Sequence, residues 1–360
     1  MPLRKEILNV ASRLIEFESV TGNMDQISAC IDYIKNYFAH TSVSIAEHCF
    51  KGHPALFISF NGKKNQDVIL NGHIDVVEGH STQFHPFIED GKLYGRGSND
   101  MKSSVAVFMV LMKELASQKD PPKVGLMIVS DEESTGNGTK MMVRAGYRSK
   151  FVLCGEPTRL RIETKHKGTL VVRVTAYGSH SHGSRPWQGV NAIDKLIRQY
   201  RKLLAEVPQA TTSRKWLPTI NPSGIHAEGP FNVTPAKAVM VLDIRTTEDF
   251  TNRKMKALLK SVGMKYSVIV EGGMLLNPIK SKPIRLLRKI THKQLGKKHP
   301  YVKSCGSSDM KFFSDKGITA VNFGPFGKNH HKSNEYVEVG SLLPYYSIVH
   351  DFVHQCQPYL

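Results

Sequence analysis

Residues of the kinds that bind divalent metal ions follow four short apolar stretches of this 360-residue sequence. The stretches at residues 68–70, 124–129, 151–154 and 318–323 lead to His73, to Glu132 and Glu133, to Glu156 and, through a glycine-containing loop, to His331. Apolar runs of this length that end in turn residues predict buried strands. In an open α/β sheet, ligands bind beyond the carboxyl ends of the strands. The pattern therefore predicts a His/Glu/Glu/His metal site at one edge of a sheet.

Neighbouring acids suggest separate roles within such a site. Asp75 follows His73 by two positions. In a strand their side chains share a face, so the carboxylate can hold the imidazole and fix its tautomer. Glu132 and Glu133 are adjacent acids, which disfavour each other's ionisation unless a cation compensates. A metal ion bound by one would leave the other free as a general base. A solvated loop or helix start also explains the pair.

Asp100 has two explanations from the sequence. It stands directly before residues 101–104 and the apolar run 105–115, which is an N-cap position for a buried helix. Its flank at residues 94–99 is a tight polar turn that could instead aim the carboxylate outward. Histidine and carboxylate ligands without thiolates suit zinc, cobalt or manganese, and the sequence does not choose among these metals.

The elements that would position these residues are those of the α/β class. Helical spacing occurs at residues 3–18, 24–38 and 191–206. Residues 42–130 repeat a pattern of strand, ligand loop and helix, which predicts a central mixed sheet with flanking helices. Beyond residue 165, apolar and polar residues alternate at 169–177 and more loosely at 238–244, as in half-exposed antiparallel strands. We therefore expect a smaller α+β domain inserted into a larger α/β domain.

Composition and charge limit the classes of function. The formal net charge is +18, and much of it lies at residues 280–303, whose pattern is typical of an amphipathic helix with a solvated basic face. No aromatic stacking pattern accompanies this charge, so we expect no nucleic-acid partner, although a basic surface would attract an anionic substrate. The apolar runs are too short to span a membrane, the start does not resemble a secretory signal, and five scattered cysteines are typical of reduced thiols. These features predict a cytoplasmic protein without a membrane partner.

Six ordered segments resemble the M20 metallopeptidase family, which includes acetylornithine deacetylase and succinyl-diaminopimelate desuccinylase. The segments read GHIDVV at 72–77, GKLYGRG at 91–97 running to DMK at 100–102, DEE at 131–133, GEPT at 155–158, HGSRP at 182–186 followed by GVNA at 189–192, and HKSNE at 331–335. The resemblance extends from about residue 70 to the C-terminus. It implies a zinc-peptidase-like catalytic domain at residues 1–165 and 278–360, and an inserted lid or dimerisation domain at 166–277.

The resemblance also implies a two-metal amidohydrolase site, with zinc as the most expected metal and cobalt or manganese as alternatives. Asp100 would bridge the two ions. His73 and Glu156 would complete the ligands of one ion, and Glu133 and His331 those of the other. Substrate-binding positions of the family fall on Asn232, Arg245, Gly306, Ser307 and Ser308. For Arg245, a purely structural role in a strand remains an equal alternative.

The remaining implied roles concern catalysis. A water that bridges the ions would attack the scissile carbonyl, and Glu132 would take its proton and pass it to the leaving amine. Asp75 would orient His73, and His182 would stabilise the oxyanion. In dimeric members this histidine reaches the active site from the partner's lid domain, so a homodimer is implied.

The expected substrate is a small N-acyl amino acid, because deacylases of the family tend to have glutamate at the position of Glu156. N-succinyl-diaminopimelate is preferred over N-acetylornithine, since an anionic acyl group suits a basic protein; the reaction would belong to lysine or arginine biosynthesis. One alternative is an exopeptidase, either a di- or tripeptidase or a carboxypeptidase. An alternative of another class is a non-catalytic scaffold or basic-surface binding protein, which the intact catalytic positions disfavour.

Overall fold

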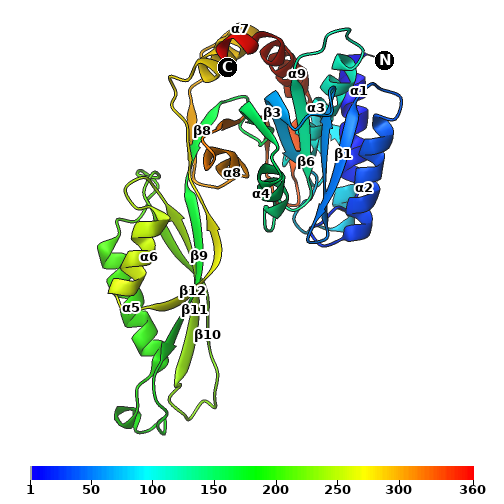
Figure 1. The fold of residues 1–360 in the computed structure, drawn as a ribbon. Helices are drawn as coiled ribbons and strands as arrows, with labels where there is room; N and C mark the ends of the chain where they lie inside the picture. Colours follow the sequence, from blue (N-terminus) through cyan, green and yellow to red (C-terminus); the bar gives the residue numbers. More distant parts are fainter. Residues whose placement is uncertain (1) are drawn as a thin grey trace. The chain divides into compact units, whose positions relative to one another are not determined.

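The computed structural model describes residues 2–360 and divides them into two compact units, each visible in Figure 1. The larger unit contains the chain up to Lys165, Leu276–Lys303 and Ser308–Leu360. The smaller unit contains His166–Leu275 and Ser304–Ser307. The role of the smaller unit as a lid or dimerisation domain stays a prediction.

A mixed sheet forms the centre of the larger unit. Its strand order is β1-β2-β6-β3-β7-β15-β8-β13, with β14 paired to β8. The bounds are β1 Ser44–Phe50, β2 His53–Ser59, β3 Asn65–His73, β6 Val124–Val129, β7 Arg148–Cys154, β8 Glu163–His166, β13 Leu275–Leu276, β14 Val302–Ser304 and β15 Thr319–Asn322. The four strands β6, β3, β7 and β15 run parallel, whereas β1, β2 and β8 pair antiparallel to their neighbours. The predicted α/β class with a central mixed sheet is confirmed.

Burial explains why the parallel strands appear in the sequence as continuous apolar runs. All six residues of β6 are buried, as are the last six residues of β3 and the last four of β7. Parallel strands are covered on both faces, so their sequences lack the alternation of a half-exposed strand. The ligand-bearing turns therefore begin where these buried runs end.

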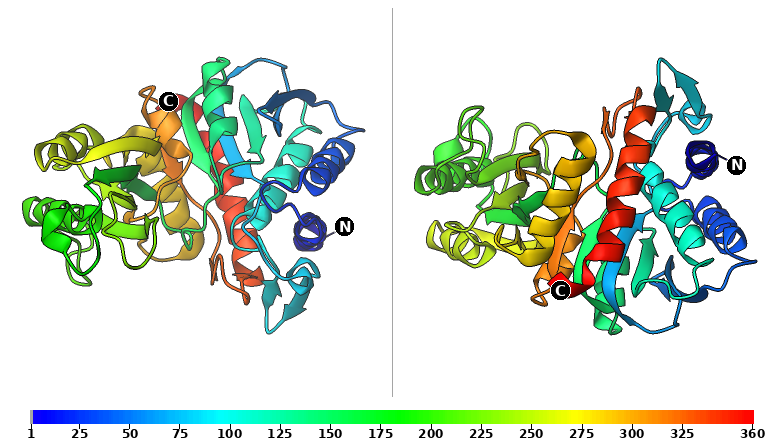
Figure 2. Two further views of the ribbon diagram at one scale, coloured as in Figure 1. Left: turned by 90° about the horizontal axis from the view of Figure 1, so that it is seen from below. Right: turned by 90° about the horizontal axis from the view of Figure 1, so that it is seen from above.

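Helices pack around this sheet. Their bounds are α1 Leu3–Glu16, α2 Met24–Tyr37, α3 Lys102–Leu115, α4 Asn137–Arg144, α7 Lys282–Leu295, α8 Met310–Ser314 and α9 Val339–Gln355. The helix α3 contacts both α1 and α9, as Figure 2 also shows, and α9 contacts α7. A second small sheet, in the order β16-β17-β5-β4, consists of Gly327–Lys328, Tyr336–Glu338, Lys92–Tyr94 and Phe87–Glu89. Within residues 2–360, no helix combines the length and the apolar character that a membrane crossing requires.

The start of α3 lies directly against the ends of two site-bearing strands. A Cβ added at Gly72 would come within 2.8 Å of the Val105 side chain, and one at Gly155 within 2.5 Å of Ser104. Only glycine permits this approach, because any larger residue would push the helix away. The predicted N-cap role of Asp100 is wrong, since α3 begins at Lys102 and its N-cap residue is Met101.

The smaller unit is an α+β sandwich of one sheet and two helices. The sheet has the order β10-β11-β9-β12, and the helices contact β9, β11 and β12. The bounds are β9 Gly168–Tyr177, α5 Ala192–Glu206, β10 Thr219–Ala227, β11 Lys237–Thr246, α6 Asn252–Ser261 and β12 Lys265–Gly272. Buried and less buried residues alternate along β11, so the predicted antiparallel, half-exposed strands are confirmed.

Candidate metal centre

Strand register brings the expected ligands to one edge of the larger sheet. His73 is the last residue of β3 and lies opposite Val129, so residues 131–133 follow just beyond it. Asn71 lies opposite Cys154, which places Glu156 about level with His73. Because β3, β6 and β7 are parallel, their carboxyl ends meet at the same edge.

The imidazole of His73 contacts acids on both of its nitrogens. Nδ1 lies 2.9 Å from the backbone oxygen of Asp75 and 3.5 Å from its carboxylate. Nε2 lies 3.2 Å from Asp100 Oδ1 and 3.9 Å from Glu156 Oε1. A hydrogen bond from Nδ1 to a backbone oxygen leaves Nε2 directed at the acids, which is the tautomer a metal ligand needs.

Asp75 contacts His73 in a different way from the one expected. It lies beyond the end of β3, so the alternation of a strand does not set its direction. Its carboxylate accepts the backbone N–H groups of Glu132 at 3.2 Å and Glu133 at 3.0 Å, and the Thr21 hydroxyl at 3.1 Å. Asp75 therefore fixes the turn that carries the two glutamates as well as the histidine.

Asp100 lies between two imidazoles. One carboxylate oxygen is 3.2 Å from His73 Nε2, and the other is 3.6 Å from His331 Nε2. The side chain is only 12% exposed, so both oxygens are committed to this site. A carboxylate that faces two separate imidazoles has the arrangement needed to bridge two cations.

Glu335, a residue that the sequence did not single out as functional, holds the turn that carries Asp100. Its Oε1 accepts the backbone N–H groups of Asn99 at 2.9 Å and Asp100 at 3.0 Å. Its Oε2 accepts the Gly97 N–H at 3.1 Å and pairs with Arg96 Nη1 at 2.7 Å. These contacts join residues more than 230 positions apart, and the only local signal is an acid directly after the polar Ser333-Asn334 pair.

The two adjacent glutamates face different neighbours. Glu133 Oε1 lies 3.0 Å from His331 Nε2. Potential ligand atoms of Glu133, His73 and Asp100 also lie within 4.8 Å of one another. For Glu132, the corresponding set within 4.8 Å consists of one ligand atom each from Glu132, His73 and Glu156. Within residues 2–360, Glu132 is paired with neither histidine at ion-pair distance. The two glutamates therefore have different neighbours in the centre, apart from His73, which is close to both.

The electrostatics of this centre suit a bound cation. Burial raises the pKa of Glu132 to about 8, with the Asp309 carboxylate adding to the effect. Burial also raises the pKa of Glu156 well above its ordinary value, and Asp100 adds to this. Hydrogen bonds to Asp100 and Glu133 raise the pKa of His331 to about 10. Such crowded acids ionise together only when positive charge is close, and the histidine–carboxylate donor set fits zinc or a similar divalent ion.

The expected oxyanion-stabilising residue, His182, and the five expected substrate-binding residues divide between the two units. His182, Asn232, Arg245, Gly306 and Ser307 belong to the smaller unit, whereas Ser308 belongs to the larger one. His182 is exposed and its Nδ1 lies 2.8 Å from the Ser184 hydroxyl. The backbone oxygen of Asn232 accepts the N–H of Gly183, next to His182, at 2.6 Å.

Arg245 is held by neighbours of its own sheet. Its guanidinium contacts both carboxylate oxygens of Asp243, at 2.9 and 3.0 Å, and donates to the Thr169 hydroxyl at 2.9 Å. This bidentate pairing supports the structural alternative for Arg245, because the fork that would bind a substrate carboxylate already binds an acid. Its assignment to substrate stays a prediction.

The loop at residues 306–308 contains polar groups in three different environments. The Gly306 N–H donates to the Ser304 hydroxyl at 3.0 Å, and the Ser308 hydroxyl lies 3.2 Å from Asn322 Oδ1. The buried Ser307 hydroxyl has no hydrogen-bond partner among residues 2–360. Of these three, Ser307 is the one whose side chain remains available to a ligand.

Relatives with curated names match nearly the whole chain. A probable succinyl-diaminopimelate desuccinylase from Staphylococcus aureus (strain MRSA252) is 24% identical over 96% of each chain. The succinyl-diaminopimelate desuccinylase of Hydrogenovibrio crunogenus is 28% identical over 94% of this chain and 95% of that protein.

Solved structures share the fold at lower sequence identity. A tripeptidase from Staphylococcus aureus superposes with a TM-score of 0.80 and 18% identity, with 97% of each chain covered. A dinuclear metal-binding M20 peptidase from Bacillus subtilis has a TM-score of 0.70 and 12% identity over 99% of each chain. The sequence model described as peptidase family M20/M25/M40 matches residues 69–355, which confirms the resemblance and covers most of the chain. With this match and the histidine–carboxylate centre, the chain belongs to peptidase family M20/M25/M40 and is a hydrolase of amide bonds.

Proposed function

We propose that this hydrolase is a two-metal deacylase that removes the acyl group from an N-acyl amino acid. Asp100 would bridge two divalent ions, most readily zinc. His73 and Glu156 would hold one ion, and Glu133 and His331 the other. Ions held in this way polarise a scissile carbonyl and lower the pKa of a water molecule.

The residues of the chain supply the remaining steps. Glu132 accepts the proton of the attacking water and returns it to the leaving amine, since its carboxylate lies within 4.8 Å of His73 and Glu156 without an ion pair to either site histidine. Asp75 keeps the His73 tautomer through its backbone oxygen and keeps the Glu132 turn in place through its carboxylate. His182 donates a hydrogen bond to the oxyanion of the tetrahedral intermediate.

The separation of Glu132 from Glu133 is the observation that carries this proposal. Glu133 is committed to His331 at 3.0 Å, whereas Glu132 remains free of both histidines and lies within 4.8 Å of His73 and Glu156. A scaffold protein would have no need for an unpaired, partly buried carboxylate at the edge of a metal centre. A hydrolase needs such a group as its general base.

N-succinyl-diaminopimelate is the preferred substrate. Both relatives described above are named as desuccinylases of this compound, and glutamate at position 156 is typical of deacylases in the family. The net charge of +18 favours an acyl group that carries a carboxylate of its own. This assignment would place the enzyme in the cytoplasm and in lysine biosynthesis, with N-acetylornithine and arginine biosynthesis as the alternative.

Exopeptidase activity is the second candidate. The tripeptidase from Staphylococcus aureus shares the fold over 97% of each chain. The same metal centre would serve both reactions, because each is the hydrolysis of an amide bond by a water molecule. Only the pocket around the leaving group and the acyl group would differ.

A side-by-side assay tests these assignments. The purified, zinc-loaded protein is supplied with N-succinyl-diaminopimelate, N-acetylornithine and a tripeptide at equal concentrations, with Glu132→Gln as the matched inactive control. We expect the highest kcat/KM for the succinyl compound and none of these activities in the control. Faster tripeptide cleavage would replace the deacylase by an exopeptidase, and turnover of none of the three would contradict both assignments.

A homodimer through the smaller unit is part of the proposal. The strand β12 is at the edge of its sheet and exposes Val268, Ile269 and Val270 by 42–47%. An exposed apolar edge strand is suited to pairing with another chain. Sedimentation equilibrium should therefore give a dimer for the native protein and a monomer for Ile269→Lys. A native protein that is monomeric at micromolar concentration would contradict the proposal.

A further inference from the structure

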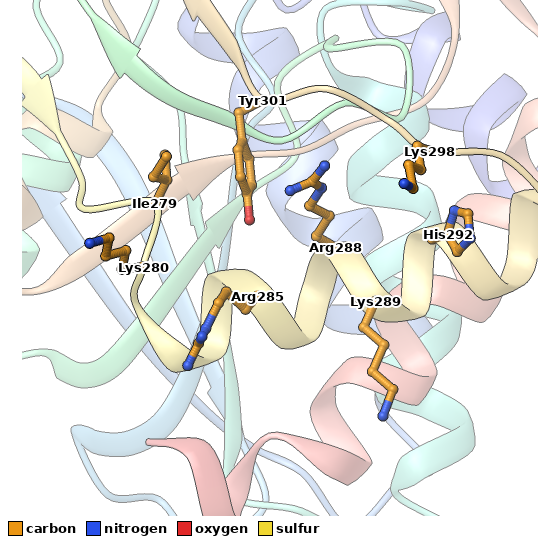
Figure 3. A pocket seen from close by; sticks show the side chains of 8 residues that line it. All are labelled: Ile279, Lys280, Arg285, Arg288, Lys289, His292, Lys298 and Tyr301. Carbon is orange, nitrogen blue, oxygen red and sulfur yellow. The ribbon is translucent and has the colours of Figure 1, made fainter.

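A surface pocket of about 530 Å³ lies along α7 in the larger unit, as Figure 3 shows. It is lined by residues of α7, of the segment before it and of the segment that follows it. None of the lining residues belongs to the metal centre. Its volume is in the range of pockets that hold cofactor-sized molecules.

Positive charge dominates this α7 pocket. Five lysine and arginine side chains line it together with His292, and none of its lining residues is acidic; the five are Lys280, Arg285, Arg288, Lys289 and Lys298. Among residues 2–360, Lys280, Arg285, Lys289 and Lys298 form no ion pair or side-chain hydrogen bond. These four side chains are exposed, so together they present positive charge that attracts an anion of several charges.

The two remaining lining residues, Tyr301 and Ile279, are aromatic and apolar. The Arg288 guanidinium carbon lies 4.7 Å from the centroid of the Tyr301 ring. In Figure 3, Ile279 lies on the side of this ring away from Arg288. Ile279 is 50% exposed and so offers apolar surface to a ligand. An aromatic ring fits between such groups, because Tyr and Arg both stack on planar ligands.

We propose that the α7 pocket binds a nucleoside polyphosphate, with the phosphates on the cations of α7 and the base beside Tyr301 and Ile279. A single carboxylate would leave most of these cations unneutralised, whereas a triphosphate carries enough charge to engage several of them. Arginine binds phosphate oxygens bidentately, so Arg285 is the principal anchor. The bound nucleotide would have a regulatory or positioning role separate from amide hydrolysis.

A second hollow of about 450 Å³ shares Arg285 and Lys289 with the α7 pocket and is also lined by Lys282 and Tyr359. Two aromatic hollows on one basic helix also resemble the surfaces that bind single-stranded nucleic acid. The five lysine and arginine side chains of the first hollow, against three in the second, favour the compact polyanion. An oligonucleotide therefore has to be one of the probes.

Isothermal titration of the zinc-loaded protein with ATP, inorganic triphosphate, adenosine and a 12-nucleotide single-stranded RNA tests the proposal. We expect one ATP per chain, weaker binding of triphosphate, weaker binding still of adenosine, and an ATP affinity that falls as salt is raised. The Arg285→Glu/Lys289→Glu variant should lose at least about tenfold in ATP affinity, because hydrogen bonds to charged groups contribute strongly.

The matched control is Arg4→Glu/Lys5→Glu, which reverses one exposed arginine and one exposed lysine on α1 of the same unit. It makes the same change of net charge and should leave the ATP affinity within about twofold. Equal losses in both variants, or an unchanged affinity in the α7 variant, would overturn the proposal, since ATP would then bind through net charge or at the metal centre. Tighter binding of the RNA than of ATP would also overturn it. Tyr301→Phe keeps the aromatic ring and removes only the hydroxyl. It should retain ATP binding, because the proposed contact with the base is made by the ring.

Discussion

The carboxylate of Glu335 accepts the backbone N–H of Asp100 at 3.0 Å, although the two residues are separated by most of the chain. The same carboxylate also binds the N–H groups of Gly97 and Asn99 and the guanidinium of Arg96. Both side chains of the Arg96–Glu335 pair are almost fully buried, at 4% and 1% exposure. The position of the expected bridging carboxylate thus depends on an acid from a distant loop.

Glu335→Gln should destabilise the protein and lower its metal content together. Glutamine keeps one acceptor oxygen but leaves the buried Arg96 charge without a partner, which costs about 3 kcal/mol of the free energy of unfolding. Urea denaturation and elemental analysis of the purified variant measure the two effects. Glu338→Gln, three residues along the chain and only partly buried, is the matched control and should change neither. Full stability and full metal content in Glu335→Gln would show that the ion pair does not hold the site.

Glu132→Gln and Glu133→Gln should fail in different ways. Glu132→Gln should lower kcat by at least about a hundredfold while the metal content stays close to that of the native protein, because only the general base is removed. Glu133→Gln should lose bound metal, since Glu133 is the acid that faces His331 at 3.0 Å. Activity and metal content are measured on the same preparations. Equal metal loss in both variants would make Glu132 a ligand and refute its role as the base.

The ends of the parallel strands could be predicted because the signal is local. Buried parallel strands are continuous apolar runs, so His73 at the end of β3 and Glu156 two residues after β7 can be recognised as ligand-type residues that follow such runs. The order of the strands in the sheet then brings these residues together without any further requirement on the sequence.

Contacts between distant segments could not be predicted in the same way. The hydrogen bonds of Glu335 to the Asp100 turn, and of Asp75 to the Glu132–Glu133 turn, depend on tertiary packing that leaves no periodic pattern. The N-cap error at Asp100 has a similar cause, because a helix start with no side-chain cap at Met101 has no sequence signal. Likewise, nothing in the sequence indicates that Arg245 pairs with Asp243, two residues away on the same strand, rather than with a ligand.

Glu163 should make the stability of the protein depend on pH. Burial raises the pKa of Glu163 to about 7, and its hydrogen bond from Asn322 only partly opposes this. The folded state therefore holds a proton that the unfolded state releases near its ordinary pKa of 4.5, so stability is greatest below that value and falls as the pH rises toward 7. The loss should be roughly 3 kcal/mol.

Melting temperatures of Glu163→Gln and the native protein at pH 5 and pH 8 check this dependence. The variant cannot ionise at this position, so its advantage over the native protein should increase from pH 5 to pH 8. Glu89→Gln, at an exposed position, provides the control and should follow the native protein at both pH values. A constant difference between Glu163→Gln and the native protein would show that Glu163 is not protonated in the folded state.

Mixed dimers should show whether His182 acts within its own chain or in the partner's active site. Glu132→Gln and His182→Ala are each expected to be nearly inactive as homodimers, with kcat lowered more than KM changes, because both groups act on the transition state. If His182 acts in the partner's site, a mixed dimer has one site with both groups intact and one site with neither. Random mixing of the two variants in equal amounts would then restore about a quarter of the native activity. If His182 acts within its own chain, every site lacks one group and mixing restores nothing.

Recovery of activity on co-refolding, with both variants confirmed as dimers by sedimentation, would therefore support the proposed dimer through the smaller unit. Absence of recovery from well-mixed dimers would confine His182 to its own chain.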